Sequence, residues 1–283
     1  AMREENPALV YTSLTLCGQT GPLRDKPGHD PVALALAGVL SRTGEDPDAP
    51  GLPGFAAADV VTGAHAGFAT LAAVMEARAT GAGRHVDVAM SDCSLVLLAN
   101  LIARYEDPAD IPPRGTRRAD MGLWRCADGE WLVTTDMEPR YWAAFCEAMG
   151  KPDYARWQLD PERRAEIREG LQAVFATRPR DHWLAHLEAA GTQFAPVNSL
   201  TDALAEPHFR ERGMVIALDA PGGALTQAGP PVRLGAFTAP APAALPGTPT
   251  AEVLRGLDLT ETQINALAAS PAQQTGHTTP APH

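Results

Sequence analysis

The sequence has few cysteines and little positive charge. Its 283 residues contain 23 Lys and Arg against 34 Asp and Glu, a formal charge of −11. This charge disfavours nucleic acid and anionic membranes as partners. The four cysteines form no Cys-x-x-Cys pair and are too sparse for a disulfide scaffold. They are Cys17, Cys93, Cys126 and Cys146. We expect them to be reduced and mostly structural.

Long apolar runs and an N-terminal targeting signal are also lacking. No uninterrupted apolar run is long enough to span a bilayer, and Ala1-Met2-Arg3-Glu4-Glu5 has no hydrophobic signal core. We therefore expect a cytoplasmic protein without a membrane partner. A hydrophobic share of 45% and a charged share of 20% are typical of a folded globular chain, whose length allows one or two domains.

The first hundred residues alternate between strand and helix patterns. Strands are predicted at 9–14 and 85–90, and buried helices at 31–40 and 57–79. Gly81-Ala82-Gly83 is predicted to cap the second helix, and a further helix should start after 90, with Ser91 or Asp92 as its cap. This order indicates an α/β layer with a mainly parallel sheet.

A second, α+β region follows. Asp128-Gly129 indicates a hairpin, and helical patterns cover 138–149, 162–176 and 181–190. A Gly/Pro-rich stretch at 221–249 precedes a short helix pair near 250–269. We predict a large α/β domain at 1–107, a linker at 108–121, a small α+β domain at 122–213, a return linker with the C-terminal part of the large domain at 214–269, and a disordered tail at 270–283.

Single residues carry only weak functional signals. His29 and Asp30 stand together at a helix start, which is also what a surface turn looks like. Asp59 and Glu138 read equally well as ordinary carboxylates at helix starts. His182 and His186 have helical spacing but no accompanying ligand set, so we expect no metal.

Longer motifs, taken in order, resemble the family III CoA-transferase (CaiB/BaiF) group, and within it the α-methylacyl-CoA racemase branch. The match covers nearly the whole chain. The motifs that carry it include Gly18-Gln19-Thr20-Gly21-Pro22, Lys26-Pro27-Gly28-His29-Asp30, Asp59-Val60-Val61-Thr62-Gly63, His85-Val86-Asp87-Val88 and Glu138-Pro139-Arg140-Tyr141-Trp142. The resemblance implies a large α/β domain with a partial Rossmann-like parallel sheet, a small α+β domain and an interlocked homodimer.

The resemblance also implies the site. His29, backed by Asp30 and Glu138, would face Asp59 across the α-carbon of a 2-methylacyl-CoA thioester. Inverting that carbon requires removing a proton from one face and returning one to the other, which two acid/base groups can do. CoA would be part of the substrate, with no permanently bound cofactor. The segment lining the thioester would comprise Gly28, His29, Asp30, Pro31, Val32 and Ala33.

Two alternatives stay open. In CoA transfer, the family's other activity, Asp59 would be a nucleophile; His29 and the lack of a longer glycine run than Gly222-Gly223 favour the racemase. Family members also have an N-terminal βα segment before the first strand seen here. The second alternative is therefore a non-catalytic relic, or a subunit that needs a separately encoded N-terminal half.

Overall fold

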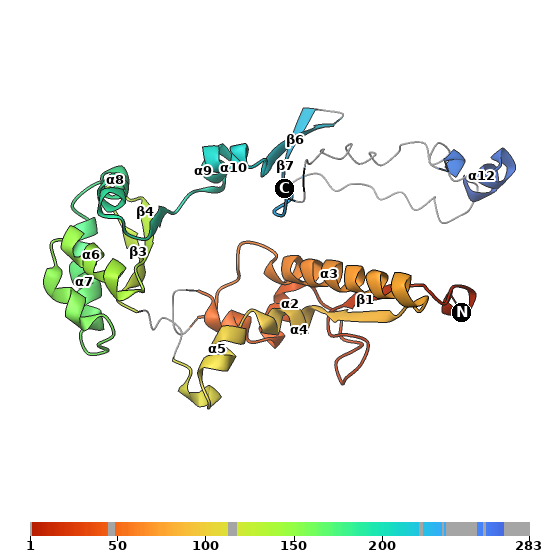
Figure 1. The fold of residues 1–283 in the computed structure, drawn as a ribbon, viewed down its shortest axis with the longest axis horizontal. Coiled ribbons are helices and arrows are strands. Elements are labelled where there is room, and N and C mark those ends of the chain that lie inside the picture. Colours follow the sequence, from red (N-terminus) through yellow and green to blue (C-terminus); the bar gives the residue numbers. More distant parts are fainter. Residues whose placement is uncertain are drawn as a thin grey trace. The chain divides into compact units, whose positions relative to one another are not determined.

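The computed structural model describes residues 2–44, 49–112, 118–220, 223–233, 235, 254–256 and 259–268 (Figure 1). The chain divides into two compact units. Unit 1 comprises Ala1–Gly129 and Val133–Phe194, and unit 2 comprises Glu130–Leu132 and Ala195–His283.

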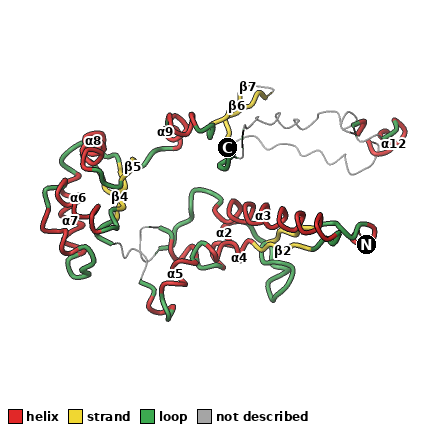
Figure 2. Tube along the Cα trace, in the orientation of Figure 1, coloured by secondary structure: helices red, strands yellow, loops and turns green. Residues whose placement is uncertain are grey.

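Unit 1 opens with a parallel strand pair covered by a long helix. Strand β1 (Tyr11–Thr15) lies in register along β2 (His85–Ala89), and α3 (Ala57–Thr80) packs against both (Figure 2). The Oγ1 atoms of Thr12 and Thr70 are 2.7 Å apart, which joins β1 to α3. The predicted α/β arrangement is confirmed.

Shorter helices complete this layer. They are α1 (Met2–Glu5), α2 (Asp30–Leu36), the 3-10 turn η1 (Val39–Arg42), α4 (Met90–Val96), α5 (Ala99–Arg104) and η2 (Pro108–Asp110). Leu34 of α2 and Ala58 of α3 are fully buried and share one core with Leu16 and Met90. The starts of α2 and α3 are therefore held next to each other by apolar packing.

By length and composition alone, α3 could cross a membrane, since its most apolar window has a mean hydropathy of 1.3 and is 17% buried. It packs, however, along β1, β2, α2 and α4. That is where the helix of a layered α/β domain lies. Its C-terminus is capped as predicted: Gly81 has φ +73° and donates its N–H to the Ala77 carbonyl at 2.8 Å.

The middle of the chain is built on a small sheet and an aromatic core. The sheet has the order β3 (Met121–Arg125), β4 (Trp131–Thr135), β5 (Phe194–Pro196), and the helices are α6 (Pro139–Ala148), η3 (Pro152–Trp157), α7 (Arg164–Phe175) and α8 (Arg180–Ala190). The Phe175 ring lies 5.3 Å from Trp124, 5.3 Å from Trp183 and 6.3 Å from Phe145. Gly129, with φ +87°, forms the predicted hairpin turn.

Unit 2 holds two short helices, a hairpin and a separate helix. Its elements are α9 (Leu200–Ala205), α10 (Pro207–Glu211), β6 (Val215–Ala220), β7 (Gly223–Ala228) and α12 (Glu261–Ala268). Ser199 and Asp202 form a capping box at the start of α9. Strands β6 and β7 pair antiparallel.

Three sequence expectations need correction. The helix predicted at 31–40 ends at Leu36, because Gly38 adopts a left-handed conformation with φ +78° that starts η1. The helix expected after residue 90 is two helices, α4 and α5, and Ala89 rather than Ser91 or Asp92 precedes the first. No strand was predicted within 214–269, the stretch expected to hold a return linker and the C-terminal part of the large domain, and the β6–β7 hairpin lies there. The tail at 270–283 and most of 221–249 lie outside the described residues, and the domain boundaries stay a prediction.

Candidate functional site

The start of α3 is capped by a residue of α2. Ala56, which precedes α3, makes no side-chain cap, so the first N–H groups of that helix need another acceptor. Asp30 provides it: its Oδ2 accepts from the N–H of Ala58 at 2.6 Å and of Asp59 at 3.2 Å. Asp30 is only 8% exposed, and its carboxylate serves as the cap of α3. One carboxylate thus ties the first turns of two helices together.

This cap places Asp59 next to Asp30, the chain neighbour of His29. His29 precedes Asp30 in an extended conformation, and its carbonyl accepts from the N–H of Val32 at 2.9 Å. Both His29 and Asp59 are exposed, and within the described residues neither side chain makes a hydrogen bond or ion pair. The structure therefore brings three predicted catalytic residues to one place and leaves two of their side chains open to a ligand.

Glu138 is not joined to that group. It directly precedes α6, is exposed, and caps none of the α6 N–H groups with its side chain. Across the described part of the chain, no hydrogen bond or ion pair links Glu138 to His29, Asp30 or Asp59. Its role beside His29 stays a prediction.

The segment predicted to line the thioester is part exposed and part buried. Gly28, His29 and Pro31 are exposed and Val32 is half-buried, whereas Ala33 is fully buried in the core. A Cβ at Gly28 would lie 2.9 Å from Leu16 Cδ2 and 2.9 Å from Val32 Cβ, so packing itself requires glycine there. Contact of this segment with CoA stays a prediction.

The backbone N–H groups at the start of α3 are already occupied. Those of Ala58 and Asp59 donate to Asp30, and that of Val60 donates to the Ala56 carbonyl at 3.2 Å. An oxyanion formed beside Asp59 would therefore need other donors.

A buried polar network precedes Glu138, and sequence reasoning missed it. Asp136 is fully buried; its Oδ1 accepts from the Gln193 N–H at 2.8 Å, while its Oδ2 has no partner. Burial, followed by the charges of Asp120 and Glu138, raises the pKa of Asp136 to about 6 despite that hydrogen bond. Gln158 Nε2 donates to the Met137 carbonyl at 2.7 Å. This network fixes the backbone immediately before Glu138.

Other candidate chemistry is weaker. Among the described residues, no group of three or more His, Cys, Asp and Glu side chains could hold a metal ion. The rings of His182 and His186 stack 6.0 Å apart, and His186 Nε2 lies 2.8 Å from the Ala148 carbonyl. Burial, with the charge of Asp136, raises the pKa of the Cys146 thiol to about 12, so it stays protonated and unreactive.

Known proteins resemble this chain over most of its length. The family described as CoA-transferase family III matches residues 1–249. A succinyl-CoA:mesaconate CoA-transferase from Haloarcula marismortui is 32% identical over 246 residues, covering 82% of this chain and 62% of that protein. A mouse succinyl-CoA:glutarate CoA-transferase is 29% identical over 242 residues, covering 82% and 55%. The chain therefore spans little more than half the length of these relatives.

Solved structures show the same fold. A CaiB/BaiF family protein from Brucella suis superposes with a TM-score of 0.69 at 28% identity, covering 82% of this chain and 63% of that one. A protein from Mycobacterium tuberculosis gives a TM-score of 0.72 at 25% identity, covering 83% and 65%.

Proposed function

The chain belongs to CoA-transferase family III, and from that premise we propose that it acts on acyl-CoA thioesters by transferring CoA between carboxylic acids, with Asp59 as the nucleophile. The observation that carries the proposal is the placement of Asp59, exposed and unpaired in the first turn of α3 beside the buried cap of Asp30. The relatives named as CoA-transferases support this reaction over the racemisation expected from sequence.

The reaction can be written with Asp59 alone as the covalent group. Its carboxylate attacks the donor thioester carbonyl, expels CoA thiolate and forms a mixed anhydride. The thiolate attacks the Asp59 carbonyl, which forms an aspartyl-CoA thioester and releases the donor acid. The acceptor carboxylate then attacks this thioester and expels CoA thiolate again. Attack of that thiolate on the acceptor carbonyl forms the new acyl-CoA and restores Asp59.

A second candidate is inversion of the α-carbon of a 2-methylacyl-CoA. His29 favours it, because an exposed imidazole beside the Asp30 cap gives a second proton-transfer group that CoA transfer does not need. His29 would remove the α-proton and Asp59 would return one to the opposite face of the enolate, or the reverse for the other stereoisomer. Glu138 would have to reach His29 for the pairing expected from sequence.

One experiment separates the two reactions. A pure 2-methylacyl-CoA is incubated with the protein in deuterated water, with and without a free carboxylic acid, and mass spectrometry follows both α-deuterium and newly formed acyl-CoA. CoA transfer predicts new acyl-CoA only when the acid is present. Inversion predicts α-deuterium without it. If neither product forms, the chain by itself catalyses neither reaction on this substrate.

Single substitutions test which residues take part in each reaction. Asp59→Asn should lower CoA transfer by about a thousandfold or more, because an amide is no nucleophile, whereas His29→Ala should leave most of it. In an inverting enzyme both changes should abolish deuterium uptake. Asp25→Asn, which changes an exposed carboxylate that pairs with Arg24, is the control. Transfer that survives Asp59→Asn would remove Asp59 from the mechanism.

We also propose an oligomeric state and a cellular location for the protein. We expect a homodimer, supported by the exposed apolar face of α3, and a cytoplasmic location, supported by four cysteines that form no disulfide within the described residues. A separately encoded N-terminal half stays an alternative source of CoA-binding residues. Its addition to the deuterated-water experiment would test whether the chain needs it.

A further inference from the structure

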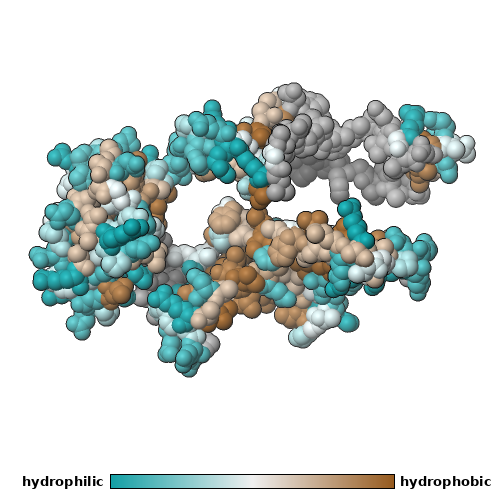
Figure 3. All heavy atoms as spheres, viewed as in Figure 1, coloured by the Kyte–Doolittle hydropathy of each residue, from teal (hydrophilic) through white to brown (hydrophobic). Residues whose placement is uncertain are grey.

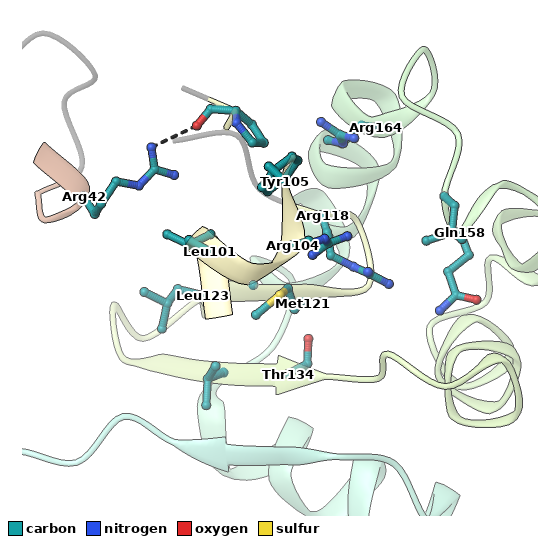
Figure 4. Close-up of a pocket in the computed structure, with 14 residues that line it drawn as sticks. Arg42, Leu101, Arg104, Tyr105, Arg118, Met121, Leu123, Thr134, Gln158 and Arg164 are labelled. Atoms are coloured by element: carbon teal, nitrogen blue, oxygen red, sulfur yellow. Dashed lines mark hydrogen bonds between the residues drawn. The ribbon is translucent and has the colours of Figure 1, made fainter. Parts of the chain in front are cut away.

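Unit 1 contains a cavity of about 680 Å³ that is not lined by the residues of the His29, Asp30 and Asp59 group. Its lining comes from α5, from β3 and β4, and from the chain around Gln158 and Arg164 (Figure 4). A volume of this size suits a small organic ligand. None of His29, Asp59 and Glu138 lines it.

The lining is basic although the chain is acidic. Four arginines line the cavity: Arg42, Arg104, Arg118 and Arg164. Within the described chain, no carboxylate lines it. A protein with a formal charge of −11 repels anions at long range, so this local excess of guanidinium groups is a feature of the cavity and not of the surface in general.

Two of the four guanidinium groups are free to bind a ligand. Arg118 is engaged by Asp120, with its Nε 2.8 Å from Oδ1, and Arg42 Nη1 donates to the Pro112 carbonyl at 2.9 Å (Figure 4). Arg164 makes no hydrogen bond or ion pair within the described residues, and Arg104 only lies over the Tyr105 ring, at 5.8 Å from its centroid. The guanidinium N–H groups of Arg104 and Arg164 are therefore available to donate hydrogen bonds to a ligand.

Apart from the arginines, Tyr105, Thr134 and Gln158, the lining is apolar. It includes Leu101, Met121, Leu123, Val133 and Leu159. Apolar walls with a few convergent polar groups are the usual composition of a ligand site. Guanidinium groups match the planar oxygen pairs of carboxylates and phosphates by forked hydrogen bonds.

We propose that this cavity binds an organic anion with a carboxylate or phosphate head and an aliphatic body, held by Arg104 and Arg164. The head lies against the two guanidinium groups and the body against the leucine side chains. Two sources share this chemistry: a free carboxylic acid and a phosphorylated molecule. The proposal does not depend on whether the site at Asp59 transfers CoA or inverts an α-carbon.

One wall of the cavity is held by hydrogen bonds within the protein. Gln158 Nε2 donates to Asp120 Oδ2 at 2.8 Å as well as to the Met137 carbonyl, and Asp120 is almost fully buried. Asp120 thus accepts from both Arg118 and Gln158, and the Gln158 amide also holds the backbone next to Glu138. A preformed wall reduces the conformational entropy lost on binding.

Calorimetry with matched eight-carbon probes tests the proposal. Octanoate, octyl phosphate and octanol have the same body and differ in the head group. We expect octanoate or octyl phosphate to bind at least tenfold more tightly than octanol, and to bind more weakly as salt is raised. Tighter binding of octanoate identifies a free acid as the source, and tighter binding of octyl phosphate a phosphorylated ligand.

Substitutions of the two arginines test whether the anion binds in this cavity. Arg104→Ala and Arg164→Ala should each weaken anion binding by about tenfold, the usual effect of losing a charged hydrogen-bond donor. Arg78→Ala, which removes an exposed arginine at the end of α3, is the control and should change nothing. The proposal is overturned if no probe binds, if octanol binds as tightly as the anions, or if the Arg104→Ala/Arg164→Ala double variant keeps full affinity.

Discussion

Asp136 shows how one buried residue can make stability depend on pH. The carboxyl group has one hydrogen-bonded oxygen and one without a partner, in a fully buried position after β4. An ionised carboxylate is costly to bury without full hydrogen bonding, and the nearby charges of Asp120 and Glu138 add repulsion. These causes together raise its pKa from 3.8 to about 6.

The raised pKa of Asp136 makes the folded protein less stable as the pH increases. Since the pKa is higher in the folded state than in the unfolded chain, the folded state binds more protons between about pH 4 and pH 6. The contribution of Asp136 to the free energy of unfolding is therefore greatest below this window and is lost as the pH rises through it. The loss is roughly 2 to 3 kcal/mol.

Asp136→Asn should remove this dependence because an amide does not titrate. The variant's free energy of unfolding, minus that of the wild type, should rise by roughly 2 to 3 kcal/mol from pH 4 to pH 8 in urea denaturation. Asp153→Asn, which changes an exposed carboxylate 3.6 Å from Arg156, is the control and should show little change. An Asp136→Asn difference that stays constant with pH would contradict the assignment.

Sequence patterns identify residues whose signals are local, and miss those whose partners lie far along the chain. His29, Asp30 and Asp59 are found because each stands at a helix start inside a recognisable motif. Asp136 receives its hydrogen bond from Gln193, 57 residues later, and its burial depends on packing. Arg104 and Arg164 share a cavity only after folding. No local pattern indicates either feature.

At the scale of elements, α2 and α3 depend on each other. The start of α3 has no cap of its own, and its Ala58 N–H is buried against Asp30 Oδ2. A carboxylate near a helix N-terminus is favoured both by these hydrogen bonds and by the helix dipole. The cap therefore couples the positions of His29 and Asp59 to helix stability.

Asp30→Ala should destabilise the protein by about 1 to 3 kcal/mol in urea denaturation, because it leaves helix N–H groups without an acceptor. Asp30→Asn should lose less, since the amide oxygen can still accept. Asp25→Asn, close in sequence but exposed, should have little effect. Equal stability of the wild type and Asp30→Ala would show that another group caps α3.

The elements predicted correctly are those with long, regular patterns. The helix predicted at 57–79 is α3, and the two strands of the parallel pair lie within two residues of their predicted bounds. The helix predicted at 31–40 has an apolar pattern that continues through Gly38, so only the backbone conformation shows where α2 ends. The β6–β7 hairpin was missed because glycine and proline around its turn read as a linker.

At the scale of the whole molecule, the apolar face of α3 is the main unexplained surface. Val60, Phe68, Leu71 and Met75 are each more than half exposed, and their spacing places them along one stripe of the helix. Figure 3 shows apolar side chains gathered around α3. Exposed apolar patches of this kind commonly mark interfaces. A second copy of the chain is the partner that the family resemblance implies.

The dimer expectation can be tested by sedimentation velocity. At about 50 micromolar the chain should sediment as a dimer, because burying four large apolar side chains from each copy contributes roughly 1.5 to 3 kcal/mol per side chain before the costs of association. Phe68→Glu with Met75→Glu should shift it to the monomer, since two charges would be buried at the contact. Leu200→Glu, a matched change at an exposed leucine of α9, should leave the dimer intact. A wild-type monomer, or a dimer that survives Phe68→Glu with Met75→Glu at unchanged helix content, would place the self-association surface elsewhere or exclude it.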